Sequence, residues 1–215
     1  ILSYSIPFKG KLNYEELIKK LYYLKDLPDW IPYRTCYYGN NWGFCLTYND
    51  FMKLDKNDIY EVVIDSECYD GSLSYGELII KGEVDKEILI STYICHPSMC
   101  NDNLSGISVS TYLAKYLLDL DNYYTYRFVF VPETIGAIAF LHNNLNVLKQ
   151  NAIGGYVVTH VGDEGDFTYL QTRIENQLVD KITLFLLKEE NINHKIRQFF
   201  DCGSDERQYN YPGVD

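Results

Sequence analysis

The feature that most constrains the fold of this chain is a regular alternation of short apolar runs with amphipathic segments from about Val62 onward. Apolar runs of four to nine residues predict buried β-strands, and apolar residues spaced three and four apart predict helices. The expected strands cover 62–65, 76–82, 87–95, 126–131, 154–159 and 194–200. The expected helices cover 104–120, 134–144 and 177–190. Strands that alternate with helices are connected by right-handed crossovers, so we expect a parallel or mixed sheet with helices on both faces.

The first 62 residues have a different texture, with short aromatic runs, turn residues and one expected helix over 14–24. We therefore predict two domains, a partial β-rich lobe at 1–62 and an α/β domain at 63–215. The predicted fold class is α/β, a three-layer α/β/α sandwich with a mainly parallel or mixed sheet, accompanied by the small β-rich lobe.

Composition excludes several classes of function. The 215 residues carry 19 Lys and Arg against 30 Asp and Glu, a net charge of −11, which disfavours nucleic acid and anionic membrane surfaces as partners. No apolar run approaches the ~20 residues of a membrane helix, and no signal peptide is visible. The six cysteines include no CxxC pair and are expected to be reduced thiols. A cytoplasmic protein with a small-molecule or peptide substrate is expected, and its oligomeric state stays open.

Polar residues follow three of the expected strands directly. His96, Glu133 and His160 stand just after the runs that end near 95, 131 and 159, and Asp102 lies in the loop after the first run. Ligands of open α/β sheets bind at the carboxyl ends of the strands, so these four side chains should converge. Two imidazoles and a carboxylate suit tetrahedral zinc with one position open for water. A further carboxylate, Glu133, suits the general base that deprotonates this water.

Each of these residues also has a structural interpretation. A histidine at a strand end can be a hydrogen-bonded or surface residue, Asp102 can cap the next helix, and Glu133 can favour a helix dipole. Their joint occurrence at one sheet edge favours a site.

Four ordered motifs, CHPSMCNDNLSG, PETIG, THVGD and GSDERQYNYPGV, resemble the co-catalytic zinc aminopeptidase family that includes leucyl aminopeptidases and glutaminyl cyclases. More closely, they resemble a bacterial branch associated with polysaccharide biosynthesis, in which a small β-rich domain is inserted into the peptidase domain. The resemblance covers nearly the whole chain. It implies that His96 binds zinc, that Asp102 bridges metals, that Glu133 is the general base and that Asp205 lies near the substrate end.

The chain departs from this family pattern at three positions. Ser98 replaces an Asp that orients the first histidine, Thr134 replaces a Glu that binds zinc, and His160 replaces a metal-binding Asp. Loss of a residue that orients a ligand weakens metal binding by about 10–100-fold. The last metal-binding histidine of the family would lie beyond Asp215, so we expect a longer protein. The predicted metal ligands are His96, Asp102 and His160, which hold one zinc ion rather than two.

These residues predict a metal-dependent hydrolase that cleaves an amide bond, most simply an aminopeptidase-like enzyme. Asp205 and Glu206 would receive a substrate ammonium group, and Arg207 would bind a carboxylate. Two alternatives stay open. One is a degenerate peptidase fold that acts as a binding or scaffold module, and the other is an amidohydrolase that acts on a modified sugar.

Overall fold

The computed structural model describes residues 1–37, 39–96, 99–200, 204–212 and 214. The chain forms two compact units, Ile1–Gly71 and Ser72–Asp215. The boundary near Val62 that the sequence predicted is therefore displaced. The reason is that the apolar run at 62–65 belongs to a strand of the first unit, which pairs over its whole length with a strand near the N-terminus.

The first unit is built on the antiparallel pair β1 (Phe8–Asn13) and β4 (Ile59–Ile64). A second pair, β2 (Leu21–Tyr22) with β3 (Phe44–Cys45), is parallel and two residues long. The short helices are α1 (Tyr14–Leu17), a 3₁₀ turn (Ile18–Lys20) and α2 (Tyr48–Phe51). The helix expected over 14–24 is thus wrong beyond residue 20, because the chain enters β2 there.

Buried apolar residues of the first unit gather around Trp42. Its ring stacks on Phe8 with ring centroids 4.2 Å apart, and Leu17, Val62 and Ile64 complete the buried cluster. Residues from both strands and from α1 therefore share one small core.

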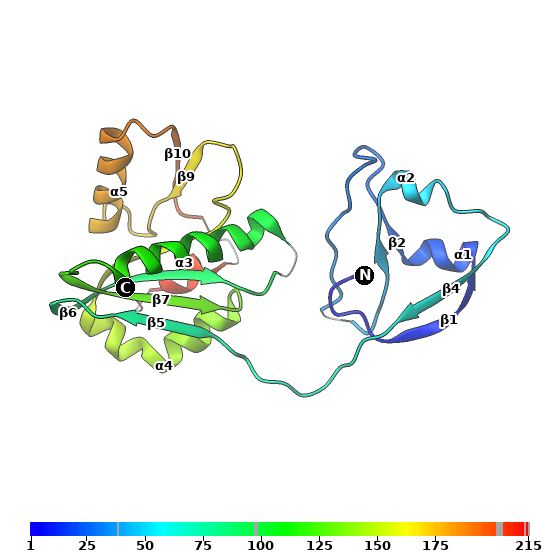
Figure 1. Ribbon diagram of the computed structural model, residues 1–215, viewed down its shortest axis with the longest axis horizontal. Coiled ribbons are helices and arrows are strands. Elements are labelled where there is room, and N and C mark those ends of the chain that lie inside the picture. The colour runs from blue at the N-terminus through cyan, green and yellow to red at the C-terminus, as the bar shows by residue number, and fades with distance from the viewer. Residues whose placement is uncertain (38, 97–98, 201–203, 213, 215) are drawn as a thin grey trace. The chain divides into compact units, whose positions relative to one another are not determined.

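The second unit contains a four-stranded mixed sheet in the order β5-β7-β6-β8 (Figure 1). Its strands are β5 (Gly76–Ile80), β6 (Val84–Tyr93), β7 (Tyr124–Val131) and β8 (Ala152–Val157). The last three are parallel, and β5 is the antiparallel edge strand. The expected mixed sheet, with the runs at 87–95 and 126–131 side by side, is confirmed.

Alternation along the strands divides the core between the two faces of this sheet. Ile90 and Phe128 pack with α3 (Ser105–Leu118), whereas Leu89 and Val129, one position away on each strand, pack with α4 (Ile135–Asn151). Successive side chains of a strand point to opposite faces, so the two helices cover opposite sides of the sheet, as Figure 1 shows.

A charged cluster is buried within the sheet. Arg127 of β7 donates from Nε and Nη2 to the two carboxylate oxygens of Glu87 at 2.9 and 3.0 Å, and it also pairs with Glu77 of β5. Bidentate hydrogen bonding satisfies the charges of Arg127 and Glu87 where water has little access.

The rest of the second unit comprises two more strands and two helices. The strands β9 (Phe167–Leu170) and β10 (His194–Arg197) form a separate parallel pair. The helices are α5 (Leu178–Glu189) and α6 (Asp205–Tyr209), and a π-helical turn, η2 (Cys100–Leu104), precedes α3. Within the described residues, no helix is long and apolar enough to span a bilayer.

Candidate active site at the carboxyl edge of the sheet

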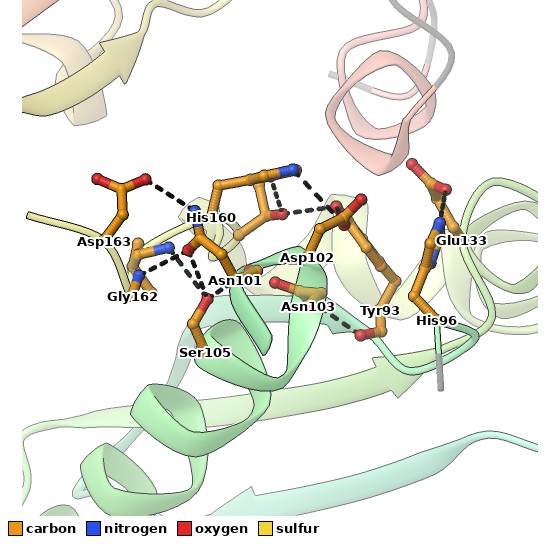
Figure 2. Close-up of polar contacts among 12 residues, drawn as sticks. Tyr93, His96, Asn101, Asp102, Asn103, Ser105, Glu133, His160, Gly162 and Asp163 are labelled. Atoms are coloured by element: carbon orange, nitrogen blue, oxygen red, sulfur yellow. Dashed lines mark hydrogen bonds and ion pairs between the residues drawn. The ribbon is translucent and has the colours of Figure 1, made fainter. Parts of the chain in front are cut away.

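The parallel strands β6, β7 and β8 end at the same edge of the sheet, and the predicted site residues follow them there. His96 comes after β6, Glu133 after β7 and His160 after β8, with Asp102 in η2. The four residues form two imidazole–carboxylate pairs (Figure 2).

The first pair joins the chain segments that follow β6 and β7. His96 Nε2 lies 3.6 Å from Glu133 Oε2, and both side chains are largely buried. This separation exceeds the 2.7–3.2 Å range of an N–H···O hydrogen bond. The two atoms therefore face each other across a gap.

The second pair is Asp102 with His160, again with 3.6 Å between Oδ1 and Nε2. Two hydroxyl groups hold it: Tyr93 donates to Asp102 Oδ1 at 2.6 Å, and Thr159 donates to the Tyr93 oxygen at 2.7 Å. Since the Thr159 proton is used in this way, its oxygen accepts from His160 Nδ1 at 2.8 Å. This contact fixes the ring orientation of His160, so that Nε2 faces Asp102.

Tyr93 connects the two pairs, since its ring centroid lies 5.2 Å from that of His96 while its hydroxyl contacts Asp102. Burial, together with the hydrogen bond to Asp102, raises the pKa of Tyr93 well above its ordinary value, so the phenol keeps its proton and remains a donor. Sequence reasoning missed Tyr93 and Thr159. The signal that could have found them was their position: Tyr93 ends the strand that precedes His96, and Thr159 directly precedes His160.

Cys95 is a third potential ligand beside the first pair. Donor atoms of Cys95, His96 and Glu133 all lie within 4.8 Å of one another. The Cys95 sulfur lies 3.3 Å from His96 Nδ1 and accepts the Glu133 backbone N–H at 3.2 Å, and burial raises the pKa of the thiol. The set predicted from the sequence, His96 with Asp102 and His160, is not such a compact group among the described residues.

The loop after β8 is attached to the start of α3 by side-chain hydrogen bonds. Asn101 donates to Asp163 at 2.7 Å and accepts from the Gly162 N–H at 2.8 Å, and Ser105 accepts from the Val161 N–H at 3.1 Å. These contacts are drawn in Figure 2 and fix the segment that carries His160.

Asp102 itself makes no capping hydrogen bond to the helix that follows, so the interpretation as a helix cap is not what the structure shows. The neighbouring Asn103 is buried and donates to the Thr92 hydroxyl at 2.8 Å and to the Tyr93 carbonyl at 3.0 Å. Gly106 permits this close packing, since a Cβ there would lie 2.3 Å from the Val158 carbonyl oxygen and 2.5 Å from Asn103 Oδ1.

The turn after β7 is strained. Thr134 has φ 62° and ψ −68°, and the Ile135 N–H donates to the Glu133 carbonyl at 2.7 Å, which together define a γ-turn of the rare form. Backbone of this kind costs of order 1–3 kcal/mol and occurs at functional sites when the surroundings enforce it.

The residues predicted to contact substrate lie on α6. Asp205 is fully buried and accepts the Thr134 N–H at 2.7 Å. Burial, with the charges of Glu133 and Glu206, raises its pKa to about 7. Glu206 is half-buried and Arg207 is exposed. Position 98, where a serine departs from the family pattern, lies outside the described residues.

Comparison with known proteins gives a consistent picture. A family profile described as "Domain of unknown function (DUF4910)" matches residues 4–215. A Clostridium acetobutylicum protein named "Putative polysaccharide biosynthesis protein with aminopeptidase-like domain" is 48% identical over 214 residues, 100% of this chain and 49% of that protein. The chain thus spans about half the length of the curated relative that it matches.

A solved structure from Clostridium acetobutylicum, titled as that of a "putative peptidase" at 2.37 Å resolution, superposes with a TM-score of 0.95 and 48% identity. The match covers 99% of this chain and 50% of the solved chain. The fold is therefore that of a protein described as a peptidase.

Proposed function

This chain belongs to the DUF4910 family, and from that premise we propose that it is a zinc-dependent hydrolase that cleaves an amide bond in the manner of an aminopeptidase. The aminopeptidase-like name of its relative and the peptidase title of the similar structure support this assignment. The helices on both faces of the β5–β8 sheet are consistent with a three-layer peptidase domain.

The observation that carries the proposal is that a histidine nitrogen and an aspartate oxygen face each other across a gap longer than a hydrogen bond. His160 Nδ1 lies 2.8 Å from the Thr159 hydroxyl, and Nε2 of the same ring points at a carboxylate oxygen 3.6 Å away. An imidazole nitrogen and a carboxylate oxygen that face each other can share one metal ion as ligands. Ligands at 2.0–2.2 Å from a tetrahedral zinc ion are about 3.3–3.6 Å apart, which agrees with the separation in the Asp102–His160 pair.

The donor set fits zinc in its chemistry as well, with imidazole nitrogens and carboxylate oxygens at one sheet edge. In our proposal His96, Asp102 and His160 hold one ion. Tyr93 and Thr159 fix the orientation of Asp102 and the tautomer of His160, the usual task of groups behind metal ligands.

The chemistry that a bound zinc ion supplies is polarisation of the scissile carbonyl and a water with a pKa near 7. Glu133 would act as the general base, taking a proton from the attacking water and returning it to the leaving amine. Its carboxylate faces the His96 imidazole at 3.6 Å, and its backbone N–H donates to the Cys95 sulfur. The next residue, Thr134, donates its N–H to Asp205.

Of the three α6 residues predicted to bind substrate, we propose this role for two. Glu206 and Arg207 are at least partly accessible and can meet an ammonium and a carboxylate group, whereas Asp205 is buried. A sugar amide is a second candidate substrate class, because the relative is named for polysaccharide biosynthesis.

Metal analysis of the purified full-length protein tests the proposal first. We expect one zinc per chain, and loss of zinc in His96→Ala and His160→Ala but not in His142→Ala, an exposed histidine on α4. Chelation should abolish hydrolysis and added zinc should restore it. A protein without bound metal would favour a scaffold module, and a panel of aminoacyl amides and N-acyl sugars would distinguish the two substrate classes.

A further inference from the structure

The position of Glu133 depends on a turn that the local sequence does not favour. Thr134 is β-branched and adopts φ 62°, a region where residues other than glycine are uncommon. The turn is closed by Ile135 N–H to Glu133 O at 2.7 Å and by Gly136 N–H to Pro132 O at 2.8 Å. An external contact is therefore needed to keep Thr134 in this conformation.

Asp205 makes one such contact. Its Oδ1 accepts the Thr134 N–H at 2.7 Å, its side chain is fully buried, and Oδ2 has no hydrogen-bond partner among the described residues. Burying a carboxylate with one protein donor is unfavourable in free energy. We therefore expect this residue to have a role other than stability. Its contact falls on the residue directly after Glu133.

We propose that Asp205 is a positioning residue that holds the Thr134 γ-turn and so directs the Glu133 carboxylate toward His96. The proposal rests on the proposed function, in which Glu133 is the general base. It replaces the predicted role of Asp205 in binding a substrate amine with a role exerted through the backbone.

The three possible roles of Asp205 differ in what its variants do. Asp205→Asn keeps an oxygen at Oδ1 for the Thr134 N–H but removes the negative charge, whereas Asp205→Ala removes the acceptor. A positioning role needs the acceptor, and a role in binding an ammonium group needs the charge. A role in stability alone changes the amount of folded enzyme and leaves kcat per folded enzyme unchanged.

The test measures kcat and KM for the metal-loaded full-length protein and, separately, hydrogen exchange of the Thr134 amide by NMR. We expect Asp205→Ala to lower kcat about 10–100-fold with little change in KM, as for other residues that orient a catalytic group. Asp205→Asn should stay close to wild type. Thr134→Gly added to Asp205→Ala should recover part of the lost kcat, because glycine adopts positive φ without strain.

The exchange measurement does not depend on hydrolysis. The Thr134 amide should be protected in the wild type and in Asp205→Asn and should exchange faster in Asp205→Ala. Equal protection in all three proteins would overturn the inference even if the enzyme is active. A rise in KM shared by Asp205→Asn and Asp205→Ala would overturn it in favour of substrate binding. An inactive wild type with the expected exchange pattern would count against the proposed function and leave Asp205 as the residue that holds the turn.

Asp180→Ala is the matched control, because Asp180 is equally buried but lies at the start of α5. It should reduce stability and leave kcat per folded enzyme unchanged. A kcat loss in this control equal to that of Asp205→Ala would show that buried carboxylates of this domain act through general stability, and the inference would fail.

Discussion

Two buried carboxylates of the second unit, Asp180 and Asp205, are in opposite situations. Asp180 accepts hydrogen bonds from the Tyr169 hydroxyl, from the Thr172 amide and hydroxyl, and from the Gln177 amide, at 2.6–3.0 Å. Burial opposes its charge, but these donors outweigh burial and the pKa lies below the ordinary value. Asp205 accepts a hydrogen bond from the Thr134 amide alone among the described residues, and burial raises its pKa to about 7.

The difference shows that the supply of donors, more than burial itself, decides whether a buried carboxylate is structural. Around Asp180 the donors satisfy the charge: the Tyr169 and Thr172 hydrogen bonds tie the β9 segment to α5, and the Gln177 amide caps α5 itself. The region around Asp205 is incompletely satisfied and adjoins Glu133. We infer that the first region serves stability and the second serves the site.

The largest expected effect is on catalysis, in the region of Asp205, where Glu133 is the proposed general base. Glu133→Gln keeps the size of the side chain and removes its proton acceptor, so kcat for amide hydrolysis should fall by about 10²–10⁴-fold. Zinc content and melting temperature should stay at wild-type values. Steady-state kinetics with metal analysis of the same sample measures both.

Glu189→Gln, on the exposed side of α5, is the control for this variant and should behave as wild type. Retained turnover in Glu133→Gln would remove the assignment as base. Loss of zinc would instead make Glu133 a ligand in the group with Cys95 and His96.

The next effect concerns pH and stability. The pKa of Asp205 rises from 3.8 to about 7 on folding, so the unfolded chain ionises first as pH increases. Its contribution therefore lowers stability progressively between about pH 4 and pH 7 and is constant above that, by a few kcal/mol at 1.36 kcal/mol per unit. Asp205→Asn lacks this titration.

Chemical denaturation of metal-free wild type and Asp205→Asn over pH 4–8 measures this contribution. The difference in unfolding free energy should shift in favour of the variant as pH increases to about 7. A difference that does not change with pH would mean that Asp205 titrates normally and that the contrast with Asp180 is unfounded.

Much of this comparison was accessible from the sequence, and part of it was not. The strands β6, β7 and β8 follow from apolar runs, and parallel strands bring residues after them to one edge, so His96, Glu133 and His160 could be placed together. Their division into two pairs depends on hydrogen bonds between distant segments, such as Thr159 to Tyr93. Local pattern carries no information about such bonds.

The same limit explains the errors. The run at 62–65 reads as a strand in either unit, and its pairing with residues near Phe8 is a contact across some fifty positions. Asp205 was predicted to lie near the substrate, and the local sequence did not indicate its burial against Thr134, which follows from how α6 packs beside α4 and β6.

A third prediction addresses the closed region. Asp180→Ala removes an acceptor shared by several donors and should lower the unfolding free energy by about 2–3 kcal/mol, since hydrogen bonds to charged groups contribute about 1.5–3 kcal/mol. Urea denaturation measures the loss. A change below about 0.5 kcal/mol, the size of ordinary surface substitutions, would contradict a structural role for this carboxylate.

The smallest effect is expected for Tyr93→Phe, which removes the hydroxyl that connects the two imidazole–carboxylate pairs of the site. Asp102 would lose its 2.6 Å donor, and Thr159 would be free to donate elsewhere, so the Nδ1 proton of His160 would no longer be enforced. Both changes loosen metal ligands without deleting one, and zinc affinity should fall about 10–100-fold.

Competition with a chelator measures the dissociation constant, and Tyr126→Phe, on the neighbouring strand β7, controls for loss of a tyrosine hydroxyl. Because Glu133 and Asp205 are untouched, kcat at saturating zinc should remain near wild type, which separates metal retention from proton transfer. Unchanged zinc affinity in Tyr93→Phe would mean that the Asp102–His160 pair does not hold the ion, and the ligands would then have to be sought around Cys95, His96 and Glu133.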